Sequence, residues 1–171
     1  GMLFNSGPDG AFVLDPAYIE SRRFRAGETV LLDCICEYRL YHADMARTAV
    51  VGEPSPRQLR MHGAVIEALA AAEASMRPGR HTRDAGTIAA AVLSEHGLDP
   101  RLTTLVVHPI GLRIFDYAEP AHESDGWTLE AGMVLNFEVF YRDAREGGMH
   151  FEDSVVVRPD GVEIFSRLDR R

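Results

Sequence analysis

Four acidic residues and one histidine interrupt stretches that otherwise have the composition of buried strands. They are Asp33, Asp44, His108, Glu138 and Glu152. Buried together, the carboxylates would repel one another and take up protons, whereas two divalent cations would neutralise all four. Four carboxylates and one imidazole suit Mn, Co, Fe or Zn better than a metal that selects thiols. The sequence therefore predicts a two-metal hydrolytic site.

A single acid in a strand is usually an edge residue or a salt-bridge partner. Here the same conflict recurs three times, at Asp33 within TVLLDCICEY, at Glu138 within LNFEVFY and at Glu152 within HFEDSVVV. Burying an unpaired charge is expensive, and metal coordination is the commonest way to keep several acids in one core. We therefore favour metal binding over a solvated acidic face.

Length and charge narrow the class of protein. The chain has 171 residues, of which 46% are hydrophobic, and this predicts one domain over residues 2–171. Its formal charge of −8 and its lack of a Lys or Arg run make nucleic acid an unexpected partner. No apolar stretch approaches the roughly 20 residues that cross a bilayer, so we expect no membrane partner and a cytoplasmic location.

Cys34 and Cys36 point to the same side of a strand, and we expect both to be buried, reduced thiols.

The order of elements predicts a fold that would bring these residues together. A hairpin is expected from strands over 29–38 and 46–52, with a turn near Arg39. Ser55 is the expected N-cap of a helix that reaches Pro78, and Thr82 the expected N-cap of a second helix.

Residues 3–28 suggest a loop that leads into a strand and turn, and the C-terminal part has further strands. The apolar positions expected to form the first helix's buried stripe are Leu59, Ile66, Leu69 and Met76. The fold class is therefore α+β, a curved antiparallel sheet with helices on one face.

Four motifs resemble those of the family that contains methionine aminopeptidase, aminopeptidase P, prolidase and creatinase, and are closest to its Xaa-Pro peptidase branch. The first is LLDCICEYRLYHADMARTAVVG, with two acids eleven residues apart. The others are HPIGL, GMVLNFEV and FEDSVVV, with His108, Glu138 and Glu152 at the ligand positions. The resemblance runs from about Gly7 to Ser166.

This resemblance implies a pita-bread fold that holds two metals about 3.5 to 4 Å apart. Asp33 would chelate one metal, Asp44 and Glu152 would bridge both, and His108 and Glu138 would hold the other. A water between the cations would be the nucleophile, and Glu138 the acceptor of its proton. The implied reaction is cleavage of a small peptide or amide.

The residues that would contact the substrate depart from the family pattern. Two family histidines are replaced here, in the segment of Leu14 and at Phe115, and His150 stands where prolidase-like members have an arginine. Asp116 and His150 could supply replacement polar groups, and His150 is placed to hydrogen-bond a carboxylate ligand. These departures leave two alternatives open, a relative that acts on a non-peptide metabolite, such as a creatinase-like hydrolase or a lyase, and a non-catalytic binding module.

The chain is also short for this family. The 28 residues before Thr29 cannot contain the two helices that normally open the domain, so the resemblance implies a protein truncated at its N-terminus. Part of the sheet would then lie uncovered, and large apolar faces rarely persist in a monomer. We therefore expect a homodimer.

Overall fold

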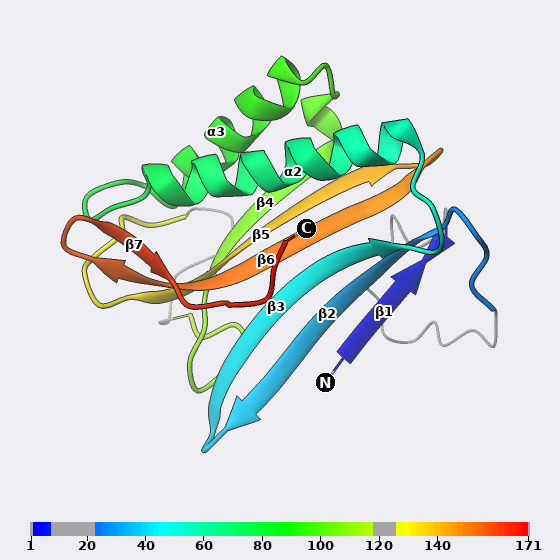
Figure 1. The fold of residues 1–171 in the computed structure, drawn as a ribbon. Helices are drawn as coiled ribbons and strands as arrows, with labels where there is room; N and C mark the ends of the chain where they lie inside the picture. Colours follow the sequence, from blue (N-terminus) through cyan, green and yellow to red (C-terminus); the bar gives the residue numbers. More distant parts are fainter. Residues whose placement is uncertain (1, 8–22, 118–125, 171) are drawn as a thin grey trace.

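The computed structural model describes residues 2–7, 23–117 and 126–170, which form two antiparallel sheets and two α-helices (Figure 1). One sheet has the order β1-β2-β3 and the other the order β4-β5-β6-β7. The strands are β1 (Met2–Ser6), β2 (Thr29–Tyr38), β3 (Tyr41–Val50), β4 (Thr103–Pro109), β5 (Val134–Asp143), β6 (Gly147–Arg158) and β7 (Gly161–Ile164). This arrangement confirms the α+β class.

The predicted hairpin is present as β2 and β3, but β3 begins five residues earlier than expected. Its first residues, YHADM, are too polar to be recognised as a strand from the sequence. The acid among them, Asp44, faces the other acidic residues rather than solvent. The turn consists of Arg39 and Leu40, both with positive φ, at 52° and 71°. Ile35 is the cross-strand partner of Asp44, and Asp33 that of Ala46, so the two acids share one face of the sheet.

At the N-terminus, residues Met2–Ser6 form β1 and pair with β2, so the loop expected from residue 3 onward is wrong for this segment. The segment of Leu14, where a family histidine is expected to be replaced, lies outside the described residues.

Helix α2 (Pro56–Ser75) begins as predicted at Ser55. The Ser55 side chain accepts a hydrogen bond from the Gln58 amide, and the Gln58 side chain accepts one from the Ser55 amide. Leu59 was wrongly assigned to the buried stripe, since it is 57% exposed. The expected residues Leu69 and Met76 are buried, and Met61, Ala64, Val65, Ala68 and Ala72 complete the buried face.

Helix α3 (Thr82–Glu95) begins one residue earlier than predicted. Its N-cap is His81, whose Nδ1 accepts a hydrogen bond from the Arg83 amide. Thr82 is instead the first helical residue, and its hydroxyl accepts a hydrogen bond from the Trp127 amide. The capping preference of threonine was outweighed by this tertiary contact.

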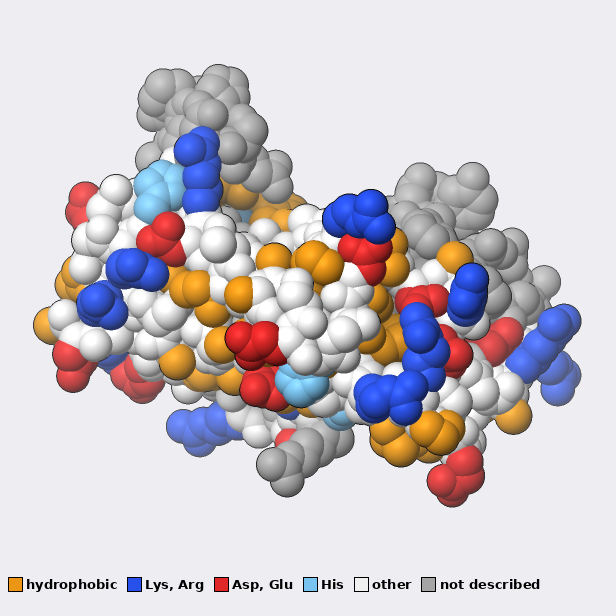
Figure 2. Space-filling model, turned by 90° about the horizontal axis from the view of Figure 1, so that it is seen from above, with side chains coloured by type: hydrophobic (Ala, Val, Ile, Leu, Met, Phe, Trp, Pro, Cys, Tyr) orange, Lys and Arg blue, Asp and Glu red, His pale blue; other side chains and the backbone are white. Residues whose placement is uncertain are grey.

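Both helices pack on one face of the four-stranded sheet (Figure 1). Alternate residues of β5, namely Phe137, Val139 and Tyr141, join the core. Because side chains alternate along a strand, Glu138 projects to the opposite face. Among the described residues, neither helix is long and apolar enough to cross a bilayer. Viewed from the helices' side, the surface carries hydrophobic, acidic and basic side chains next to one another (Figure 2).

Candidate metal centre

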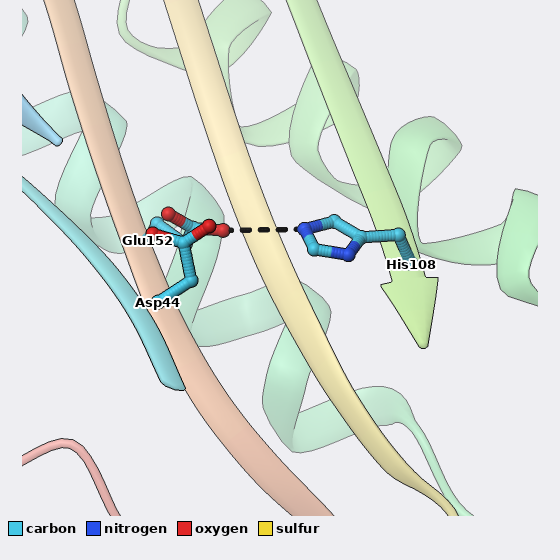
Figure 3. Close-up of side chains that lie close together, drawn as sticks. All are labelled: Asp44, His108 and Glu152. Carbon is cyan, nitrogen blue, oxygen red and sulfur yellow. Dashed lines mark hydrogen bonds and ion pairs between the residues drawn. The ribbon is translucent and has the colours of Figure 1, made fainter. Parts of the chain in front are cut away.

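Three of the five predicted ligands meet on the face of the sheet away from the helices. Asp44 from β3, His108 from β4 and Glu152 from β6 point toward one another (Figure 3). One donor atom from each lies within 4.8 Å of the other two, and all three side chains are buried. His108 Nε2 is 3.4 Å from Glu152 Oε1. Residues up to 108 positions apart in the sequence thus form one compact cluster of possible ligands.

A second group shares Glu152 with the first. Its donor atoms come from Glu138, His150 and Glu152 and also lie within 4.8 Å of one another. His150 Nε2 is 3.2 Å from Glu138 Oε2, and the other Glu138 oxygen is 3.9 Å from His108 Nε2. The two groups are contiguous, and Glu152 lies in both.

Asp33 belongs to neither group, although it borders the first. Its Oδ1 is buried and has no hydrogen-bond partner. Asp33 also acts on Asp44, because its negative charge helps burial to raise the pKa of Asp44. The structure therefore places this fifth predicted ligand beside the cluster, within electrostatic reach of it.

Crowding of buried acids has a marked effect on protonation. Burial, followed by the charges of Glu152 and Asp33, raises the pKa of Asp44 to about 9. Burial and the charges of Glu138 and Asp33 also raise the pKa of Glu152 well above its usual value. Without cations, Asp44 therefore holds its proton at neutral pH, and the shift at Glu152 is in the same direction.

The residues present fit divalent cations. Two carboxylate oxygens, Asp33 Oδ1 and Glu152 Oε2, are buried without a hydrogen-bond partner, and such atoms normally have one. Carboxylate oxygens with one or two imidazole nitrogens are a donor set that suits Mn, Co, Fe or Zn. A cation would both satisfy these oxygens and remove the repulsion between the acids.

Two polar residues that sequence reasoning missed hold Glu152 in place. Asn136 Nδ2 donates a hydrogen bond to Glu152 Oε1 at 2.9 Å, and the Ser154 hydroxyl donates to Asn136 Oδ1 at 2.7 Å. Both are buried, and each lies two residues from a predicted ligand, hence on the same face of its strand. A polar residue at that spacing from a buried acid was the available signal.

A network of ion pairs supports the same strand from behind. Arg47 donates to the Glu152 carbonyl at 2.7 Å and to Asp153 Oδ1 at 2.8 Å. Arg170 bridges Asp153 and Glu73, a buried residue of α2. The network joins β3, β6, α2 and the C-terminal segment on the face of the sheet opposite to the Glu152 side chain.

The loop after His108 contains the two remaining positions of interest. Asp116 Oδ2 accepts a hydrogen bond from the Leu112 amide at 2.9 Å, and the Asp116 amide donates to the Pro109 carbonyl. Asp116 thus closes the turn after His108, and a catalytic role for it stays a prediction. The Phe115 ring lies 4.5 Å from the His108 ring, measured between centroids, and its side chain is 51% exposed.

Comparison with known proteins gives a consistent result. Residues 2–159 match metallopeptidase family M24. An Xaa-Pro dipeptidase of Pyrococcus furiosus is 28% identical over 149 residues, which are 87% of this chain and 42% of the relative. The chain therefore spans less than half the length of that curated relative.

Solved structures agree with this match and with the predicted pita-bread fold. The prolidase from Pyrococcus furiosus superposes with a TM-score of 0.85 at 27% identity, covering 99% of this chain and 49% of that one. Dipeptidase PepE from Mycobacterium ulcerans superposes with a TM-score of 0.85 at 28% identity, covering 99% and 45% of the two chains.

Proposed function

Because this chain belongs to metallopeptidase family M24, we propose that it hydrolyses a small peptide or amide with the help of two divalent cations. Xaa-Pro dipeptides are the first substrates to test, since similar proteins carry the names Xaa-Pro dipeptidase and prolidase. The metal is Mn, Co, Fe or Zn in this proposal.

One observation carries the proposal. Carboxylates from three different strands, Asp44, Glu138 and Glu152, converge in a buried cluster. Glu152 Oε2 within it and Asp33 Oδ1 beside it have no hydrogen-bond partner. Such an arrangement is unfavourable in a protein without bound cations and favourable in one that holds them. In the loaded protein, Asp33, Asp44, His108, Glu138 and Glu152 would be the ligands.

Bound cations would polarise the scissile carbonyl and lower the pKa of a water molecule. Glu138 would then act as the proton acceptor. His150 orients it, because its Nε2–H donates to Glu138 Oε2 while Glu138 Oε1 faces His108. This contact fixes the rotamer of Glu138 and leaves one of its oxygens directed into the cluster.

The proposal is tested by metal binding and hydrolysis in parallel. Purified protein supplied with Mn or Co should bind about two ions per chain and release proline from an Xaa-Pro dipeptide. Glu138→Gln should lower kcat by at least about a hundredfold, because it removes the proton acceptor. The control is Glu163→Gln, a change at an exposed residue of β7 that should leave the rate unchanged. Fewer than one bound metal, or no cleavage of any peptide or amide, would contradict the proposal.

Phe115 favours one alternative substrate class. This exposed ring beside His108 offers no hydrogen-bond donor to an oxyanion, and losing such a donor typically costs about 10²- to 10³-fold in rate. We therefore keep a second candidate function, in which the protein is a hydrolase or a lyase that acts on a non-peptide metabolite. A metabolite screen that finds turnover of peptides alone would exclude it.

The proposal includes a cytoplasmic homodimer. Cys34 and Cys36 are free thiols, as expected in a reducing compartment, although Cys36 is exposed and the expectation that both are buried was wrong. Three large side chains at the hairpin tip, Tyr38, Leu40 and Tyr41, are also exposed and could be covered by a second copy. Light scattering that finds a monomer over a wide concentration range would contradict the dimer.

A further inference from the structure

Glu152 lies on a stretch of β6 that the neighbouring strand β7 does not reach. The ladder between the two strands ends at Val155, which pairs with Ile164. Beyond that point, residues 165–170 continue beside β6 and come into contact with β3 (Figure 1). This segment therefore takes the place of a strand partner along the part of β6 that contains Glu152.

Hydrogen bonds tie this segment to the main chain next to Glu152. The Phe165 amide donates to the Ser154 carbonyl at 3.1 Å, and the Ser154 amide donates to the Ser166 hydroxyl at 2.9 Å. The Ser154 hydroxyl in turn donates to the main-chain carbonyl of Asp44, another predicted ligand, at 2.9 Å. A displacement of the segment would therefore reach the main chain of two predicted ligands.

The side chain of Arg170 anchors the segment to β6 and to helix α2. Its Nε donates to Asp153 Oδ2 at 2.6 Å, and its Nη2 donates to the two oxygens of Glu73 at 2.8 and 2.7 Å. The other Asp153 oxygen accepts a hydrogen bond from Arg47 Nη2 at 2.8 Å. Two arginines thus balance two acids, both of which are buried. Because a buried charge without its partner is unfavourable, the four side chains hold one another in place.

Arg47 connects the same segment directly to Glu152. Its side chain donates to the main-chain carbonyls of Glu152 and Leu168, both at 2.7 Å. Side chains alternate along a strand, so Asp153 projects to the face opposite the metal cluster. Arg170, which contacts Asp153 there, can therefore act on the cluster only through the main chain of β6.

We propose that Arg170 is a positioning residue of the metal centre, which holds the main chain at Glu152 so that this carboxylate stays directed at the cations. The inference rests on the proposed function and adds the segment 165–170 to the structure that the metal centre requires. Loss of a partner outside the ligands themselves typically weakens metal binding about 10- to 100-fold. Since Arg170 acts through Asp153 and the main chain, its removal should weaken binding about 10-fold, at the lower end of this range.

The test is a calorimetric titration of metal-free protein with Mn. Arg170→Gln should bind Mn about 10-fold more weakly than the wild-type protein, and Arg170→Lys, which keeps the charge, should recover part of the loss. The absorption spectrum of the Co(II)-loaded protein is a second readout, because its intensity depends on the geometry of the ligands. We expect a changed spectrum for Arg170→Gln and one closer to the wild-type spectrum for Arg170→Lys.

A double variant separates positioning from stability. Arg170→Gln leaves the buried Glu73 carboxyl without its partner, so this variant should also unfold at a lower urea concentration. Adding Glu73→Gln removes the unpaired acid and should restore much of the stability. Mn binding should nevertheless stay weak, because Asp153 still lacks Arg170. Should Arg170→Gln fail to fold, the double variant carries the comparison with the wild-type protein.

The matched control is Arg167→Gln, a change at an exposed arginine of the same segment that should bind Mn like the wild-type protein. The inference is overturned if Arg170→Gln binds Mn as tightly as the wild-type protein, or if the double variant regains full affinity together with stability. A wild-type protein that binds fewer than one Mn per chain would overturn the proposed function and this inference together. Tight Mn binding without turnover of any peptide or amide would contradict the proposed function alone.

Discussion

Glu138 on β5 and Glu152 on β6 are direct cross-strand partners, and both side chains are buried on the same face of the sheet. Like charges opposite each other destabilise a sheet. Each acid has a histidine beside it, since His150 contacts Glu138 and His108 contacts Glu152. This pairing of acids is tolerable only when a proton or a cation lies between them.

Replacing one of the pair should therefore have opposite effects with and without metal. In metal-free protein at pH 8, Glu152→Gln should raise the free energy of unfolding by about 1 to 3 kcal/mol, because it removes an acid whose raised pKa opposes folding at this pH and keeps an acceptor for Asn136. In the wild-type protein, Mn at about 100 times its dissociation constant should add about 2.7 kcal/mol, and the variant should lose this gain. Urea unfolding with and without Mn measures both. Glu163→Gln should match the wild-type protein in each condition, and destabilisation of the metal-free Glu152→Gln protein would contradict the prediction.

Asn136 should control metal affinity without being a ligand. Asn136→Leu removes the donor that orients Glu152, and losing such a partner typically weakens metal binding about 10- to 100-fold. Ser154→Ala removes only the hydroxyl that holds the Asn136 amide, so its effect should be smaller. Calorimetric titration with Mn would rank the three proteins, and equal affinity in wild-type and Asn136→Leu protein would refute the positioning role.

Glu73 should make stability depend on pH. Burial raises its pKa from 4.5 to about 7, although Arg170 opposes the shift. The folded state thus keeps the proton to higher pH than the unfolded state, and stability from this group falls as pH rises from about 4.5 to 7 and is flat above. The difference in unfolding free energy between wild type and Glu73→Gln should decrease by up to about 3 kcal/mol across this window. Urea unfolding at a series of pH values tests this, and a difference that grows with pH would show the opposite sign.

Two leucines of helix α2 form a matched pair for the packing of the core. Leu69 is fully buried against the sheet, whereas Leu59 is 57% exposed. Leu69→Ala should lower the free energy of unfolding by about 2 to 5 kcal/mol, and Leu59→Ala should change it by less than about 0.5 kcal/mol. Thermal or urea unfolding of both variants distinguishes them, and similar losses would mean that the helix packs by another face.

The strands and helices were predictable where local pattern and tertiary contact agree. Ser55 caps its helix as expected, because both halves of a local hydrogen-bonded pair with Gln58 are present in the sequence. Thr82 and Leu59 were misassigned, because a contact with Trp127 and the orientation of the sheet, which no local pattern contains, decided their roles.

The predicted acids could be found because a charge in an apolar strand is conspicuous. Asn136 is less conspicuous, since an amide in a strand is common at a surface. Its role depends on Glu152, which lies on the neighbouring strand. Only the three-dimensional arrangement shows that Asn136 borders the cluster.

The two-residue turn at Arg39 and Leu40 joins the strands that carry Asp33 and Asp44. Inserting a single residue there would slip the pairing by one position and turn Asp44 toward the opposite side of the sheet. The turn length therefore sets the register that places these two acids on one face. The length of the turn can therefore change only in steps that keep Asp33 and Asp44 on the same side of the sheet.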